Sequence, residues 1–317
     1  MLRSFFISLS KAGWAQRWIT SWGFARRASA RFVAGETIPQ ALDAVRAMNA
    51  LGINASLDHL GENTSSPQEA REAAGEVVIL LDAIRQSGVR ANVSIKLSQI
   101  GLALSEELCR ENLARILTCA RDCSNFIRID MEDSSLTGRT LAAYFWAREQ
   151  GFENVGIVLQ AYLLRTREDL AQVTNAGGRV RLCKGAYQEP ATLAFAVKAD
   201  TDANYDHLME TLLQAAQTAG LPRASGLTPP IPALATHDER RIAAARAAVE
   251  RLGLPKDALE FQMLYGIRRD LQVALARDGF PVRVYIPYGT HWYPYFMRRL
   301  AERPANLWFF ISNFFRR

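Results

Sequence analysis

Short apolar runs alternate with longer amphipathic stretches along most of the chain. Each run has four to six residues and is flanked by turn residues, which is typical of buried parallel strands and too short for a full helix. The eight runs are residues 54–59, 93–96, 126–130, 155–160, 180–184, 233–236, 259–263 and 282–286.

The stretches between the runs carry the period of an α-helix. The clearest examples are Leu113, Ile116, Leu117 and Ala120, followed later by Ile242, Ala245, Val249 and Leu252. This spacing places one apolar stripe on each helix. Thr166, with Asp169 three residues later, further predicts a helix start at which the Thr166 hydroxyl caps a free backbone N–H.

Eight strand–helix alternations predict the α/β class and a TIM-type (β/α)8 barrel. An open doubly wound sheet is the main alternative, but it usually has a glycine-rich turn after the first strand, and Gly61 alone does not provide one. We expect an N-terminal helical arm over residues 1–50 and a catalytic barrel over residues 51–317. Residues 222–232 are predicted to form a surface loop, because Pro229 and Pro230 prevent regular hydrogen bonding there.

Composition narrows the class of protein. A length of 317 residues and 49% hydrophobic content suit one α/β barrel with a large core. The net charge of +6 is not gathered into a basic run interleaved with aromatic residues, so no nucleic-acid partner is indicated. The four cysteines show neither metal-site nor disulfide spacing, which suggests a reducing cytoplasm. Cys119 and Cys123 lie four residues apart, but the scattered histidines favour a structural role for them, and no metal is expected.

The N-terminus combines aromatic and cationic residues. Trp14, Trp18 and Trp22 repeat every four residues beside Lys11, Arg17, Arg26 and Arg27. This pattern fits a helix docked on the barrel or on another subunit, and alternatively an interfacial helix on the inner face of the cell membrane. No segment has the length of a membrane span or the pattern of a signal peptide. The sequence does not indicate a number of subunits.

Polar residues follow the predicted strands. They are Glu62, Lys96, Asp130, Glu132, Gln160, Lys184, Thr236, His237, Tyr265 and Tyr285. In a barrel they meet at one face. Lys96 and Lys184 allow a Schiff-base aldolase as one interpretation, and an ion pair with Asp130 or Glu132 as the commoner one.

An aromatic run that leads to two adjacent arginines suggests an anion site. Tyr285, Tyr288, Trp292, Tyr293 and Tyr295 precede Arg298 and Arg299. Planar forked donors suit a carboxylate ligand. A non-catalytic barrel that binds an anion or a membrane remains an alternative.

Eight segments carry a resemblance to a known family. They are LDHLGE (57–62), SIKLSQIG (94–101), RIDMEDS (128–134), VLQAY (158–162), RLCKGAY (181–187), ATHD (235–238), FQMLYG (261–266) and YIPYGTHWYPYFMRRLAERPAN (285–306). Together they resemble proline dehydrogenase in its short, monofunctional bacterial form. The resemblance implies a distorted barrel with noncovalent FAD, in which hydride passes from C5 of L-proline to flavin N5 to give Δ1-pyrroline-5-carboxylate. Membrane quinone is the implied electron acceptor.

The resemblance also implies residue roles. Asp130 and Arg181 would be catalytic, with Arg181 near N5. FAD would be held by Asp130, Met131, Gln160, Arg181, Lys184, Gly185, Ala186, Thr236 and His237. Proline would be bound by Lys96, Tyr187, Leu264, Tyr285, Arg298 and Arg299, and Glu62 would pair with Arg298 as a gate. Gln160 would meet the pyrimidine edge of the flavin. Cys183 departs from the family, which usually has valine at this position.

Overall fold

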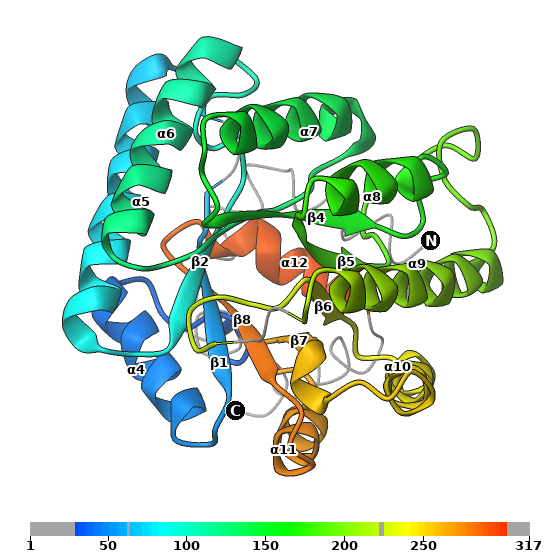
Figure 1. Cartoon of the computed structure of the whole chain (residues 1–317). Coiled ribbons are helices and arrows are strands. Elements are labelled where there is room, and N and C mark those ends of the chain that lie inside the picture. The colour runs from blue at the N-terminus through cyan, green and yellow to red at the C-terminus, as the bar shows by residue number, and fades with distance from the viewer. Residues whose placement is uncertain (1–28, 62–63, 222–224, 303–317) are drawn as a thin grey trace.

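A computed structural model describes residues 29–61, 64–221 and 225–302. Eight parallel strands form one closed barrel in chain order, and β8 pairs with β1 to complete the ring (Figure 1). The strands are β1 (Asn54–His59), β2 (Ala91–Ile95), β3 (Ile127–Ile129), β4 (Val155–Gln160), β5 (Arg179–Cys183), β6 (Pro232–Ala235), β7 (Glu260–Leu264) and β8 (Val282–Tyr288). The predicted (β/α)8 barrel is therefore confirmed.

Helices surround the barrel. They are α4 (Ile38–Asn49), α5 (Pro67–Ser87), α6 (Glu106–Asp122), α7 (Ser134–Glu149), α8 (Thr166–Asn175), α9 (Lys198–Thr218), α10 (Glu239–Arg251), the 3-10 turn η1 (Lys256–Ala258), α11 (Arg269–Arg277) and α12 (Trp292–Glu302). In α6 the predicted stripe is fully buried, Leu113 and Ile116 included. Burying each such side chain stabilises the fold by about 1.5–3 kcal/mol. The stripe therefore holds the helix against the barrel.

The predicted cap at Thr166 is wrong. Thr166 is the first residue of α8, and its hydroxyl donates to the carbonyl oxygen of Gln160 at 2.6 Å. The cap position belongs to Arg165, which has helical backbone angles. The Thr166 hydroxyl thus ties the helix back to the end of β4, where Gln160 enters the site.

Two helices distort the symmetric barrel. α12 follows β8 but contributes Tyr295 and Arg299 to the cavity at the barrel mouth, and in Figure 1 it projects onto the centre of the ring. α4 contacts β1, β8 and α5, and so occupies the outer position between α5 and α11. The part of the predicted arm that the structure describes, from residue 29, therefore packs on the barrel. Residues 1–28, with the predicted tryptophan face, lie outside the described residues.

Polar side chains at alternate strand positions meet inside the barrel. They are Ser56 and Asp58 of β1, Ser94 of β2, Arg181 of β5, Glu260 and Gln262 of β7, and Arg283 and Tyr285 of β8. Successive side chains of a strand point to opposite faces, so each i, i+2 pair faces the same interior. The barrel is consequently filled by a hydrogen-bonded column rather than by apolar layers.

The proline-rich segment before β6 closes the opposite end of the barrel. Pro229 and Pro230 are buried, so the prediction of a surface loop is wrong for them. Their segment is held by arginines: Arg179 donates to the Pro229 carbonyl at 2.7 Å, and Arg283 donates to the Ser225 carbonyl at 3.2 Å. Proline lacks the N–H that a regular strand needs. The backbone carbonyls of this segment are paired by arginine side chains instead of by a neighbouring strand.

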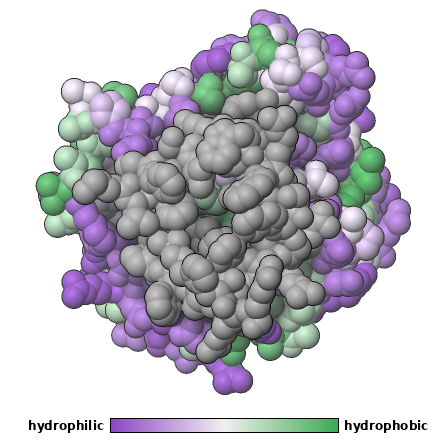
Figure 2. Space-filling view, turned by 180° about the vertical axis from the view of Figure 1, so that it is seen from behind, coloured by the Kyte–Doolittle hydropathy of each residue, from purple (hydrophilic) through white to green (hydrophobic). Residues whose placement is uncertain are grey.

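One face of the molecule can be followed in a space-filling view. On the face that Figure 2 shows, the coloured residues around the rim are largely hydrophilic, with hydrophobic residues scattered among them. Among the described helices, none is long and apolar enough to cross a membrane.

Candidate active site

A cavity of ≈ 600 Å³ lies at the carboxyl ends of the strands. The predicted site residues that line it are Lys96, Asp130, Met131, Gln160, Arg181, Lys184, Gly185, Ala186, Tyr187, Thr236, His237, Leu264, Tyr285 and Arg299. Glu62 and the side chain of Arg298 lie outside what the structure describes. Predicted residues that follow seven of the eight strands, β2 to β8, therefore share one cavity, whereas Glu132 and Tyr265, also predicted at strand ends, do not line it.

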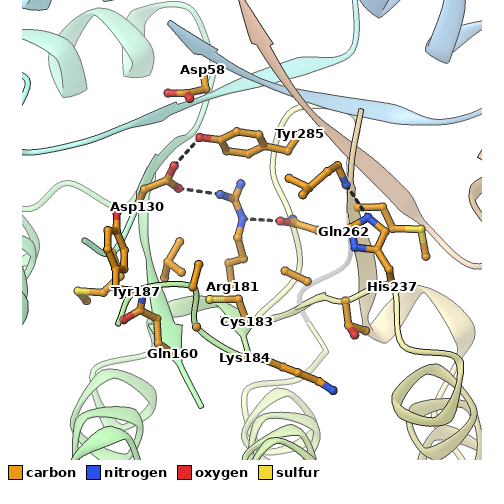
Figure 3. Close-up of a pocket in the computed structure, with 18 of the residues that line it drawn as sticks. Asp58, Asp130, Gln160, Arg181, Cys183, Lys184, Tyr187, His237, Gln262 and Tyr285 are labelled. Atoms are coloured by element: carbon orange, nitrogen blue, oxygen red, sulfur yellow. Dashed lines mark hydrogen bonds and ion pairs between the residues drawn. The ribbon is translucent and has the colours of Figure 1, made fainter. Parts of the chain in front are cut away.

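Arg181 is held on three sides (Figure 3). Its Nη1 donates to Asp130 at 2.7 Å, and its Nε donates to Gln262 at 2.5 Å. Nη2 donates to the hydroxyl of Ser94 at 3.0 Å. The ring of Tyr285 lies 5.3 Å from the guanidinium carbon. Arg181 is therefore a fixed cation with a defined plane.

Tyr285 lies close to two carboxylates, Asp130 and Asp58. Its hydroxyl donates to Asp130 Oδ2 at 2.8 Å. Burial, with the Asp130 and Asp58 carboxylates adding to its effect, raises the pKa of Tyr285 well above its usual value of 10. Burial also raises the pKa of Asp58, although the Lys96 ammonium opposes this rise. Tyr285 therefore stays a neutral donor at physiological pH.

Lys96 pairs with a residue that the strand-end analysis did not single out. Its Nζ lies 3.2 Å from both carboxylate oxygens of Asp58, on the neighbouring strand. The expectation of a direct pair with Asp130 or Glu132 is therefore wrong, because the carboxylate that pairs with Lys96 within the described part of the chain is that of Asp58. Glu132 instead accepts from the backbone N–H of Ser98 at 3.0 Å and orders the turn after Lys96.

Lys184 points to the opposite side of the cavity mouth. It donates to Asp238 at 2.6 Å and to Asp202 of α9 at 2.5 Å. The expected pairing with Asp130 or Glu132 is wrong here too. Asp238 is only partly buried, and hydrogen bonding to Lys184 lowers its pKa below 3.8 although burial opposes this. The Asp238 carboxylate therefore stays ionised at neutral pH.

The loop after β6 is fixed by Thr236 and His237. The Thr236 hydroxyl accepts from the backbone N–H of Asp238 at 3.0 Å. His237 Nε2 accepts from the backbone N–H of Leu264 at 3.0 Å. When the imidazole is neutral, its proton is therefore on Nδ1.

Gln160 and Gly185 shape the far wall. Gln160 is 3% exposed and lines the cavity, yet its Oε1 has no hydrogen-bond partner in the part of the chain that the structure describes. Gly185 has a φ of 115°, and a Cβ there would lie 2.2 Å from the Tyr162 ring. A buried acceptor without a partner marks a place where a ligand donor fits. Glycine at 185 lets the backbone lie directly against the Tyr162 ring, which any side chain at this position would prevent.

Three of the four cysteines lie away from the cavity, and the fourth, Cys183, lines the cavity but stays protonated because it is buried. Ligand atoms of Asp82, Cys119 and Cys123 lie within 4.8 Å of one another on α5 and at the end of α6. Burial raises the pKa of Cys119 to about 11, with Cys123 adding to the effect, and Arg85 already pairs with Asp82. Burial likewise raises the pKa of Cys183 to about 12. Protonated thiols are poor metal ligands and poor nucleophiles at neutral pH.

Sequence reasoning missed four polar residues of the site. They are Asp58, Ser94, Asp238 and Gln262. A signal was present for two of them, because Ser56 with Asp58 and Glu260 with Gln262 are polar pairs two residues apart within otherwise apolar strands. Such pairs indicate a polar strand face, which is a different signal from polar residues that follow the strand ends.

A closed (β/α)8 barrel with a cavity lined by cationic and polar side chains at the carboxyl ends of its strands has the architecture of a TIM-barrel enzyme. A sequence model of the proline dehydrogenase family matches residues 41–311. The chain therefore belongs to the proline dehydrogenase family, and it is an oxidoreductase.

Known proteins show how far the similarity extends. Proline dehydrogenase 1 of Bacillus subtilis is 40% identical over 99% of both chains. Proline dehydrogenase of Deinococcus radiodurans is 44% identical, over 89% of this chain and 88% of that protein. The crystal structure of proline utilization A (PutA) from Bdellovibrio bacteriovorus inactivated by N-propargylglycine matches with a TM-score of 0.78 and 27% identity, over 88% of this chain. The matched region is 33% of that PutA chain.

Proposed function

We propose that the protein oxidises L-proline to Δ1-pyrroline-5-carboxylate with FAD bound in the barrel mouth. The observation that carries this proposal is one cavity that joins the Gln160 amide oxygen, which has no partner among the described residues, to four cations, Lys96, Arg181, Lys184 and Arg299. The cavity volume of ≈ 600 Å³ lies within the range that is typical of cofactor sites. Family membership supports the same reaction.

The residues present fit a flavin. The Gln160 oxygen would accept the imide N–H of the pyrimidine edge, and Gly185, which packs against the Tyr162 ring, would keep the loop after β5 at the cavity wall. Met131 and Asp130 would flank the ring. Lys184, Ala186, Thr236 and His237 would hold the remainder of the cofactor. FAD, when bound, supplies the acceptor for the hydride that leaves proline C5.

The protein's own part is binding and electrostatics. Lys96 and Arg299, together with Arg298, would hold the substrate carboxylate by charge-assisted hydrogen bonds. Tyr285, Leu264 and Tyr187 would form the wall around the ring. Arg181, fixed by Asp130, would stabilise negative charge that develops during the reaction. The pairing of Glu62 with Arg298 as a gate stays a prediction.

The visible spectrum of the purified protein tests this proposal. We expect a yellow protein whose flavin absorption bleaches when L-proline is added without oxygen. A colourless protein that borohydride inactivates in the presence of substrate would instead support the aldolase. That alternative is disfavoured because Lys96 and Lys184 both pair with carboxylates, whereas a Schiff-base lysine must present its amine to the substrate carbonyl. A colourless protein without turnover would support a binding barrel.

We also propose that the electrons pass to membrane quinone, and that the N-terminus contacts the membrane surface. The support is the spacing of Trp14, Trp18 and Trp22 beside basic residues. Deletion of residues 1–25 should weaken sedimentation with anionic liposomes. Equal sedimentation of the deleted and full-length proteins would favour docking on the barrel.

A further inference from the structure

We propose that Gln262 is the positioning residue that fixes the plane of Arg181, and that the ion pair of Glu260 with Arg283 at the barrel floor holds Gln262 in turn. This inference rests on the proposed place of Arg181 beside the flavin. It assigns a role in the reaction to Gln262, which lines the cavity and acts through Arg181, and to Glu260 and Arg283, which lie outside the cavity lining.

Only one orientation of the Gln262 amide satisfies both of its hydrogen bonds. Its Oε1 accepts from Arg181 Nε at 2.5 Å, and its Nε2 donates to Glu260 Oε1 at 2.6 Å (Figure 3 shows the first of these bonds). An arginine can only donate, and an ionised carboxylate can only accept. The amide oxygen must therefore face Arg181 for as long as Glu260 is ionised behind it.

Glu260 is anchored in the barrel. Arg283 donates Nε to Oε1 at 2.8 Å and Nη2 to Oε2 at 3.1 Å, and the two side chains are 1% and 0% exposed. Arg283 also donates to the carbonyl of Ala55 at 2.7 Å and to that of Gly226 at 3.2 Å. A forked pair with its remaining donors satisfied is rigid. It keeps a carboxylate acceptor directly under Gln262.

Gln262 supplies the contact that stops Arg181 from turning. Asp130 holds Nη1, and the hydroxyls of Ser94 and Ser56 accept from Nη2 at 3.0 and 3.3 Å. Without the amide acceptor at Nε, the plane of the guanidinium depends on Asp130 and these two neutral hydroxyls alone, which constrain it less. Its charge would then no longer be fixed toward the cavity. Preorganised charge stabilises a transition state because no reorganisation is needed during the reaction.

The alternative is that the Gln262 side chain only fills space in the barrel. The variant Gln262→Met distinguishes this role from the positioning role. Methionine keeps the length and volume but has no acceptor comparable to the amide oxygen. For the holoenzyme we expect the flavin midpoint potential to fall by about 30 mV, which is a tenfold change for a two-electron couple. The single-turnover rate of flavin reduction by L-proline should fall about tenfold. KM should change less than about twofold, because the carboxylate site is untouched.

A control separates positioning from lost stability. Asn112→Leu removes another buried amide, which donates to the Ile100 carbonyl at 3.0 Å in the α6 region. It should lower the melting temperature without changing the potential or the reduction rate. If Gln262→Met does not fold, Gln262→Asn provides the test: it keeps an amide but is one methylene too short to join Glu260 and Arg181.

The outcomes distinguish this inference from the proposed function. An unchanged potential and reduction rate in a folded Gln262 variant would overturn the positioning role while leaving the proposed function intact. A wild-type protein without flavin, or without flavin reduction by proline, would instead overturn the proposed function.

Discussion

The ammonium of Lys96 lies 3.2 Å from both carboxylate oxygens of Asp58, across the junction between β2 and β1. The two side chains are 10% and 1% exposed, so the pair is largely shielded from water. Removing Asp58 takes away the carboxylate that faces this shielded ammonium.

Asp58→Asn should therefore lower the free energy of unfolding by about 3–5 kcal/mol. Urea unfolding measures this loss. A non-oxidisable carboxylate such as cyclopentanecarboxylate should stabilise the variant more than the wild type, because it restores an anion beside Lys96. The matched control is Asp43→Asn, which breaks an exposed pair with Arg46 and should cost at most about 1 kcal/mol. Equal losses in both variants would mean that Lys96 relaxes into water.

Arg299→Met should lower kcat/KM for L-proline roughly tenfold to a hundredfold, because a charge-assisted hydrogen bond is worth about 1.5–3 kcal/mol. Arg299 is buried and its guanidinium carbon lies 5.2 Å from the Tyr295 ring centroid. Pyrrolidine, which lacks the carboxylate, should be a poor substrate that the substitution barely affects. If proline and pyrrolidine lose activity equally, Arg299 supports the fold or the cofactor instead.

Gly185→Ala should reduce the amount of FAD that copurifies, since the new Cβ would overlap the Tyr162 ring and displace the loop after β5. Flavin absorbance per protein measures retention. Gly177→Ala is the control: Gly177 also has a positive φ, of 68°, but nothing lies within 4 Å of its would-be Cβ. That control should lose about 1 kcal/mol of stability and no flavin. Equal flavin retention in the two variants would argue against a cofactor loop at Gly185.

Asp238→Asn should flatten the acid side of the stability profile. The pKa of Asp238 is lowered in the folded protein by Lys184, against the effect of burial. A lowered folded-state pKa contributes stability that is present above the usual value of 3.8 and is lost as pH falls through the folded value. Melting temperatures across this range should therefore fall more steeply in the wild type than in the variant. Parallel profiles would show that the other carboxylate at Lys184, Asp202, carries the effect.

Strand positions were the most predictable feature. Short apolar runs between turn residues have few other ways to be buried, so β1 and β4 match their predicted bounds. Strand ends were harder: β8 runs on to Tyr288, and β3 is confined to Ile127–Ile129. Strand length depends on pairing with neighbours, which local pattern does not encode.

By itself the sequence determined the eight-fold alternation, the residues that end at the barrel mouth and the resemblance to one family. Only the tertiary structure decided which charges pair. Lys96 meets Asp58 and Lys184 meets Asp238 because barrel closure and register bring side chains from different strands and loops together. The same closure stacks Arg283, Glu260, Gln262 and Arg181 in one column. Pairing energies depend on distance and burial, and both are set only when the ring of strands closes.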